Sequence, residues 1–259
     1  MSKKYRWVDF LIIVLEIAVS VLITLYFNIK PLYEAILFFV IPTIYLLLRR
    51  KHPLKRIFLG SLLIGLGLGY IFDVISSFNN AWNELPKNLV FNFRIFGFLP
   101  VDELIWFFMF ALFIIVFYEH FFENEKKGEI STYFKYALIP TLAALLIINL
   151  LFIFIPQIFT VHYAYFVFAS LGFIPIVYMF SKYPKLFPKF LATAAFFFVL
   201  CLMYEIVALR MGQWYFPGEY IGFVAVGGVV FPLEELIFWM TIGSFSVLSM
   251  YEGFVDDEK

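Results

Sequence analysis

Two acidic motifs in this sequence stand at the start of long apolar runs and repeat at a fixed interval. Pro100-Val101-Asp102-Glu103 opens one run, and Pro232-Leu233-Glu234-Glu235 opens another in the second half of the chain. Asp73 and Glu205, each inside an earlier apolar run, are separated by the same interval as the two motifs. Ionisable groups beside lipid are costly, so they are retained mainly where they have a function. The repeated acids therefore predict a duplicated unit that uses its carboxyl groups.

Each acid of the two motifs has an aromatic residue four positions further along. The pairs are Asp102 with Trp106, Glu103 with Phe107, Glu234 with Phe238, and Glu235 with Trp239. Residues four apart share one face of a helix. A carboxyl group surrounded by apolar rings favours its neutral form and can then donate a proton, while the ring faces stabilise a developing cation. This chemistry suits protonation of an apolar substrate to a carbocation, followed by proton loss.

A purely structural interpretation of the motifs is the alternative. Proline is favoured at the start of a helix, and acids in the first turn complement the helix dipole. Capping accounts for one motif. It does not account for two copies, each with an upstream acid at the same distance before its proline.

The composition predicts a protein that crosses the membrane several times. Of the 259 residues, 63% are hydrophobic and the mean hydropathy is +0.92, against about 45–50% apolar residues in soluble domains. The formal net charge is zero, which gives no support to nucleic-acid binding. Cys201 is the single cysteine, so it forms no intrachain disulfide, and we interpret it as a small buried hydrophobe.

Eight apolar runs are long enough for transmembrane helices, which need about 20 residues each. They are residues 8–27, 32–48, 57–78, 101–122, 133–155, 163–180, 190–209 and 233–250. We expect the first run to be a retained helix rather than a cleaved signal peptide. Two shorter glycine-containing stretches, 91–99 and 221–231, are expected to be re-entrant segments or early turns of the following helices.

Basic residues predict the orientation. With a cytoplasmic N-terminus and eight helices, fifteen Lys and Arg residues fall on the inner side and four on the outer side, as the positive-inside rule requires. Both termini are then cytoplasmic, and we expect a bacterial cytoplasmic membrane. Tyr118-Glu119 and Tyr251-Glu252, at the inner ends of the fourth and eighth helices, are expected to be interfacial anchors.

The predicted fold class is an all-α polytopic membrane protein of two parallel four-helix repeats. The first repeat is 1–122, a charged cytoplasmic linker is 123–132, and the second repeat with a short acidic tail is 133–259. Four helices per repeat orient both copies the same way, so both acidic motifs lie at one depth. We expect a pseudo-two-fold axis along the membrane normal and a cavity between the halves.

The order of these residues resembles the membrane-integral lycopene cyclase family, which includes heterodimeric bacterial enzymes and the fused cyclase domain of fungal bifunctional enzymes. The resemblance rests on an acid, a Trp (Trp82 or Trp214), a glycine-containing apolar stretch and Pro-x-acid-Glu, within residues 73–107 and 205–239. Each half resembles one small subunit. The resemblance implies cyclisation of the ψ ends of lycopene, or a related C40 carotenoid, to β-ionone rings without net redox change. It also implies a place in the lipid bilayer, where other carotenoid-pathway enzymes are potential partners.

Roles for the site residues follow as a hypothesis. Glu235 or Glu234 is the acid and Asp102 or Glu103 its counterpart, while Glu205 and Asp73 act as bases or tune the acids. Aromatic residues expected to bind substrate are Trp82, Trp214, Trp106, Phe107, Phe238 and Trp239. The run Gly65-Leu66-Gly67-Leu68-Gly69 lacks the strand–turn–helix context of a dinucleotide site and is expected to pack helices. We predict no bound cofactor and no metal site.

Two other function classes fit the same residues. In a proton- or cation-coupled transporter, the paired acids would relay protons or bind a cation. In a non-catalytic carotenoid- or quinone-binding protein, the aromatic residues alone would hold the ligand. The colour of cells that accumulate lycopene separates these classes from a cyclase.

Overall fold

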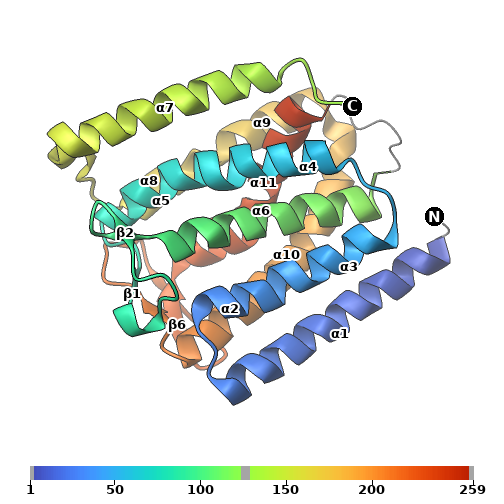
Figure 1. Cartoon of the computed structure of the whole chain (residues 1–259), viewed down its shortest axis with the longest axis horizontal. Helices are drawn as coiled ribbons and strands as arrows, with labels where there is room; N and C mark the ends of the chain where they lie inside the picture. Colours follow the sequence, from blue (N-terminus) through green and yellow to red (C-terminus); the bar gives the residue numbers. More distant parts are fainter. Residues whose placement is uncertain (1–2, 124–128, 257–259) are drawn as a thin grey trace.

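Within the part of the chain that the structure describes, seven helical segments are long and apolar enough to cross a membrane, which makes the chain an all-α integral membrane protein (Figure 1). The structure, a computed structural model, describes residues 3–123 and 129–256. Half of the predicted linker (124–128) and the end of the acidic tail (257–259) therefore lie outside the described residues. The seven segments are α1 (Lys3–Phe27), α2–η1–α3 (Pro31–Ala35, Ile36–Val40, Ile41–Arg49), α4–η2–α5 (Leu54–Ser61, Leu62–Leu68, Gly69–Phe78), α6 (Val101–Phe121), α7 (Phe134–Phe154), α8–α9 (Ala164–Ser170, Phe173–Lys182) and η5–α10 (Pro184–Leu186, Phe187–Arg210).

The eighth predicted run, 233–250, is helical but irregular. It contains the π-helix η6 (Glu235–Ile242), α11 (Gly243–Met250) and a second π-helical turn, η7 (Tyr251–Val255). A π-bulge accommodates one extra residue in a helix. The extra residue is visible in the sequence, because the interval from Glu119 to Glu252 is one position longer than that from Glu103 to Glu235. The regular helix α6 therefore corresponds to a bulged helix in the second half.

The loops that precede the two acidic motifs lie at the same end of the bundle. Strand β1 (Asn83–Glu84) pairs with β4 (Trp214–Tyr215) in antiparallel register, and Asn83 faces Tyr215, its counterpart at the repeat interval. We call residues 79–100 and 211–232 together the hairpin end. The described chain begins and ends at the opposite end (Figure 1).

The two glycine-containing stretches form β-hairpins, so the prediction of re-entrant segments or early helical turns was wrong. Strand β2 (Arg94–Ile95) pairs with β3 (Leu99–Pro100), and β5 (Phe223–Val226) pairs with β6 (Val229–Pro232). Gly227 and Gly228 join β5 to β6, and both have positive φ values, 58° and 81°. Two consecutive residues of positive φ are what a tight type I′ hairpin turn requires. Short 3₁₀ turns, η3 (Pro86–Asn88) and η4 (Pro156–Phe159), complete the connections.

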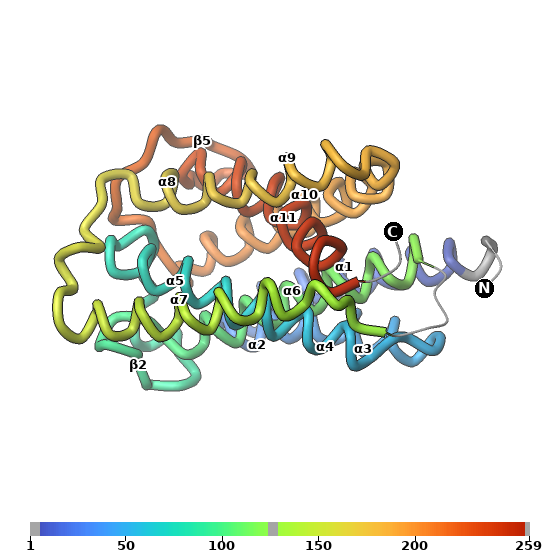
Figure 2. The backbone as a smooth tube through the Cα atoms, turned by 90° about the horizontal axis from the view of Figure 1, so that it is seen from above, coloured from blue at the N-terminus to red at the C-terminus, as the bar shows by residue number. Residues whose placement is uncertain are grey.

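The halves are interlocked rather than merely adjacent. Helix α1 packs against α10 of the second half, and α7 packs against η2 of the first half. The long helix α6 contacts both α10 and α11 at the centre. Figure 2 shows α5, α6 and α7 in one layer and α8, α9 and α10 in another.

The outermost helices present apolar side chains to the surroundings. Only 22% of the most apolar part of α1 and 17% of that of α7 is buried inside the protein. Backbone polar groups in these helices are satisfied within the helix, as a hydrocarbon environment demands. Their exposed surface is therefore suited to lipid, while the core is formed by aromatic side chains such as Phe113, Phe117 and Phe197 between α6 and α10.

The end opposite the hairpins contains a buried charge network instead of the predicted interfacial anchors. Arg56 donates hydrogen bonds to Glu119 (2.6 Å), Asp256 (2.8 Å) and the hydroxyl of Tyr251 (2.9 Å). All four side chains are essentially inaccessible, as are Tyr118 and Glu252. The sequence did not reveal this network because Arg56, which draws the acids inward, is distant along the chain from both Glu119 and Asp256. The network joins α4 and α6 to the C-terminal segment.

Candidate active site

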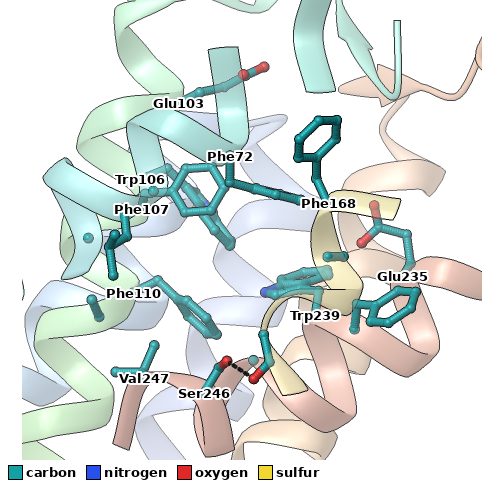
Figure 3. Close-up of a pocket in the computed structure, with 18 of the residues that line it drawn as sticks. Phe72, Glu103, Trp106, Phe107, Phe110, Phe168, Glu235, Trp239, Ser246 and Val247 are labelled. Carbon is teal, nitrogen blue, oxygen red and sulfur yellow. Dashed lines mark hydrogen bonds between the residues drawn. The ribbon is translucent and has the colours of Figure 1, made fainter. Parts of the chain in front are cut away.

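A cavity of about 550 Å³ lies between the two halves, within the range of small-molecule sites. Its walls come from η2, α5 and α6 of the first half and from α8–α9, α10, η6 and α11 of the second half. Most of the lining is aromatic or aliphatic, and the acids are confined to the part near the hairpin end. Figure 3 shows Glu103 above the rings of Phe72 and Trp106, and Glu235 to the right of Trp239.

Asp73 and Glu103 form a carboxyl pair in the first half, here called the first dyad. The Ser77 hydroxyl lies between the two side chains, 3.2 Å from Asp73 Oδ1 and 3.3 Å from Glu103 Oε2. Two neighbouring carboxylates repel each other when both are ionised, so a proton on one of them stabilises the pair. The first dyad is therefore suited to sharing one proton.

Glu205 and Glu235 form the corresponding pair, here called the second dyad. Both are almost fully buried, with 1% and 6% of their surface exposed. The Trp214 indole N–H donates to Glu205 Oε1 over 3.3 Å, and Tyr165 lines the same part of the cavity as Glu235. A carboxyl group that lines a cavity can hold a proton or take one from a ligand. The second dyad is therefore a second group able to transfer protons.

The first acid of each motif, unlike the second, accepts hydrogen bonds from backbone amides of the preceding loop. Asp102 accepts hydrogen bonds from the backbone amides of Val90 (2.6 Å) and Phe91 (3.0 Å). Glu234 accepts one from the amide of Ile221 (2.7 Å). Each of these acids therefore fastens the loop of its own half. The sequence did not distinguish the two acids of each motif as proton-transfer groups. In the structure, Glu103 and Glu235 are the members of the dyads, and Asp102 and Glu234 are not.

Removing the Asp102 carboxylate is expected to destabilise the hairpin end. In Asp102→Ala both amides lose a charged acceptor, and hydrogen bonds to charged groups contribute about 1.5–3 kcal/mol each. The Asp102→Asn variant keeps one acceptor oxygen and should lose less. Thermal unfolding in detergent measures the difference. Equal stability of Asp102→Ala and the wild type would contradict this role.

All six aromatic residues predicted to bind substrate line the cavity: Trp82, Trp106, Phe107, Trp214, Phe238 and Trp239. Among the acids, Asp102, Glu103, Glu205 and Glu235 also line it, whereas Asp73 and Glu234 do not. The rings of Trp106 and Trp239 meet across the halves with centroids 5.5 Å apart. The Trp106 indole donates to the Tyr204 hydroxyl over 3.0 Å. These contacts hold the central rings in fixed orientations.

Several lining residues were missed by the sequence reasoning, chiefly Glu84, Tyr165 and Tyr204. The repeat interval reveals an acid only where both halves carry one, and the counterpart of Glu84 is Phe216. The counterpart of Tyr165 is Tyr33, which is half exposed and does not line the cavity. The repeat alone therefore does not predict whether a tyrosine such as Tyr165 points into the cavity, because helix packing sets its direction.

The cavity is elongated along the helices rather than round. It continues from Glu235 past Gly243 and Val247 to Met250, and fifteen residues of helix span about 22 Å. On the facing side it follows the break between α8 and α9, where the Ser246 hydroxyl donates to the carbonyl of Gly172 over 2.7 Å (Figure 3). This shape fits a long, thin and apolar ligand whose end reaches the acids.

In comparisons with known proteins, no family model matches the chain, and no curated protein or solved structure is significantly similar to it. Within residues 3–123 and 129–256, no three His, Cys, Asp or Glu side chains come together in a way that could hold a metal ion. The chemistry available to the cavity is therefore argued from its own residues. Glu103 of the first dyad and both acids of the second dyad line one aromatic chamber, and carboxyl groups so placed can add a proton to an apolar ligand and remove another.

Proposed function

We propose that this protein is a carotenoid cyclase that converts the linear ψ ends of lycopene, or a related C40 polyene, to rings without redox change. The observation that carries the proposal is that buried acids of two carboxyl dyads, Glu103 of the first and Glu205 and Glu235 of the second, line one aromatic cavity inside a membrane protein. The resemblance of both acidic stretches to the membrane-integral lycopene cyclases supports the same conclusion.

The proposed reaction is an isomerisation. The first dyad donates its shared proton to the terminal double bond of the polyene, and a tertiary carbocation forms. A neighbouring double bond attacks the cation and closes the ring, which moves the positive charge onto a ring carbon. Glu235 then takes a proton from the carbon next to the charge, and a ring double bond forms. One proton enters and one leaves, so the product has the composition of the substrate.

The aromatic walls protect the cationic intermediate. The faces of Trp106 and Trp239 carry partial negative charge and attract a cation, and their rings are held by contacts on both sides. Water would capture a carbocation as an alcohol, so a chamber lined mostly by aromatic and aliphatic residues suppresses that side reaction.

The shape of the cavity supports a polyene substrate taken from the membrane. An elongated apolar slot beside α8–α9 suits a chain molecule that is insoluble in water. The charge distribution supports an orientation in which the hairpin end faces outward from a bacterial cytoplasmic membrane and both termini are cytoplasmic.

Expression in cells that accumulate lycopene tests the proposal. We expect a shift of the extracted pigment from red to yellow, with mono- or bicyclic carotenes identified by chromatography and mass. The matched control is the double variant Glu103→Gln/Glu235→Gln, which preserves side-chain shape and removes both acids. Unchanged lycopene in cells whose membranes contain the folded wild-type protein would reject the cyclase and favour a transporter or a non-catalytic binding protein.

A further inference from the structure

Glu84 is a partly buried acid beside the first dyad that the proposed reaction does not use. It lies in β1 at the hairpin end, outside the membrane-spanning helices, and lines the cavity with Asp102 and Glu103. Its Oε2 atom is buried without a hydrogen-bond partner among the described residues. The next three residues, 85–87, are exposed. Glu84 therefore stands between the surface of the protein and the acids of the cavity.

Burial and the neighbouring acids favour the protonated form of Glu84. Its ionisable neighbours are Asp73, Asp102, Glu103 and Tyr204, and Arg94 of β2 is the nearby cation. Burial raises the pKa of the Glu84 carboxyl well above its ordinary value, the carboxyls of Glu103 and Asp102 raise it further, and Arg94 opposes this shift. Arg94 is itself held by the carbonyl oxygens of Phe98 (2.7 Å) and Glu84 (3.0 Å).

The need for an exchange residue follows from the reaction. After each ring closure the first dyad has lost a proton and Glu235 has gained one. Either the substrate proton returns from Glu235 to the first dyad through the cavity, or the first dyad takes a new proton from water. The cavity walls near the dyad are apolar apart from the acids, so a water-derived proton needs a titratable carrier.

We propose that Glu84 is the proton-exchange residue of the site, connecting the first dyad with water at the hairpin end. The neutral Glu84 carboxyl transfers its proton to the ionised first dyad, and the resulting Glu84 carboxylate takes a proton from water. This inference rests on the proposed cyclisation. It assigns Glu84 no contact with the substrate.

Deuterium content of the product tests the inference. Purified protein in liposomes equilibrated with D₂O is given preformed lycopene, and the ring product is analysed by mass spectrometry. For the wild type we expect about one deuterium atom per ring, because the donor proton comes from solvent. For Glu84→Gln we expect less than about half of that value at equal conversion, because the substrate proton now returns to the dyad.

Two further variants are controls for the Glu84→Gln experiment. Glu84→Asp keeps a titratable carboxyl and should restore deuterium content to near the wild-type value. Glu219→Gln alters an exposed acid of the hairpin end that pairs with His162, and it should behave as the wild type. Thermal unfolding in detergent checks that each variant is folded.

The outcomes separate the two proposals. Wild-type deuterium content in Glu84→Gln would overturn the exchange role, and so would a folded Glu84→Gln protein that fails to form even a first ring. A Glu84→Asp product as poor in deuterium as that of Glu84→Gln would also contradict it. Absence of any ring product from the folded wild type would instead reject the cyclase.

Discussion

Glu103→Gln and Glu235→Gln are each expected to lower ring formation by at least about 100-fold, the usual loss when a general acid or base is removed. Gln has nearly the shape of Glu but cannot transfer a proton. In the proposed reaction Glu103 belongs to the dyad that donates the proton, and Glu235 is the group that accepts one. Because the two acids line one cavity, each single replacement should stop the reaction rather than halve it.

The neighbouring acids supply matched controls for this prediction. Asp102→Asn and Glu234→Gln make the same chemical change one residue earlier in each motif. Both keep an oxygen that can accept from the loop amides, so we expect ring formation within about threefold of the wild type, the size of one modest hydrogen bond. The measurement is product formed per amount of folded protein in proteoliposomes.

Two results would contradict this assignment. If Glu234→Gln were inactive and Glu235→Gln active, the acid that faces the loop would be the reacting one. If each single variant kept about half of the activity, the halves would be independent sites rather than the two walls of one site.

Arg56→Met is expected to be the most destabilising single change in the described part of the chain. It leaves the carboxylates of Glu119 and Asp256 buried without their shared cation, and breaking a buried ion pair from one side costs about 3–5 kcal/mol. Thermal unfolding in detergent measures the loss. Ring formation per folded molecule should be unchanged, because Arg56 does not line the cavity.

Lys189→Met is the control for the Arg56 prediction. Its salt bridge with Glu123 is as short, 2.6 Å, but more than a third of the Lys189 side chain is exposed. Solvent-exposed pairs contribute only about 0–1 kcal/mol. Equal losses for the two variants would show that burial does not decide the strength of the Arg56 network.

Much of the fold could be predicted because membrane helices are encoded by the length of apolar runs. The predicted run 57–78 and the observed span 54–78 end at the same residue and begin within one helical turn of each other, since the bilayer fixes how much chain is needed. The hairpins were missed because stretches 91–99 and 221–231 are apolar, and apolarity alone does not separate a short strand from the start of a helix.

The candidate site was predictable to the extent that it is duplicated. Repetition at a fixed interval identified the acids of both dyads and the six aromatic residues of the cavity. It could not separate Glu103 from Asp102, because that distinction depends on where the amides of Val90 and Phe91 lie. The place of Tyr165 in the site could not be predicted from the sequence either, since its proximity to Glu235 results from helix packing within the second half.

The most direct test of the central claim is the product made by purified wild-type protein from lycopene in liposomes. We predict a cyclic carotene whose mass equals that of the substrate, because one proton is added and one removed. Recovery of unchanged lycopene from a folded protein, or a product of altered mass, would contradict the account.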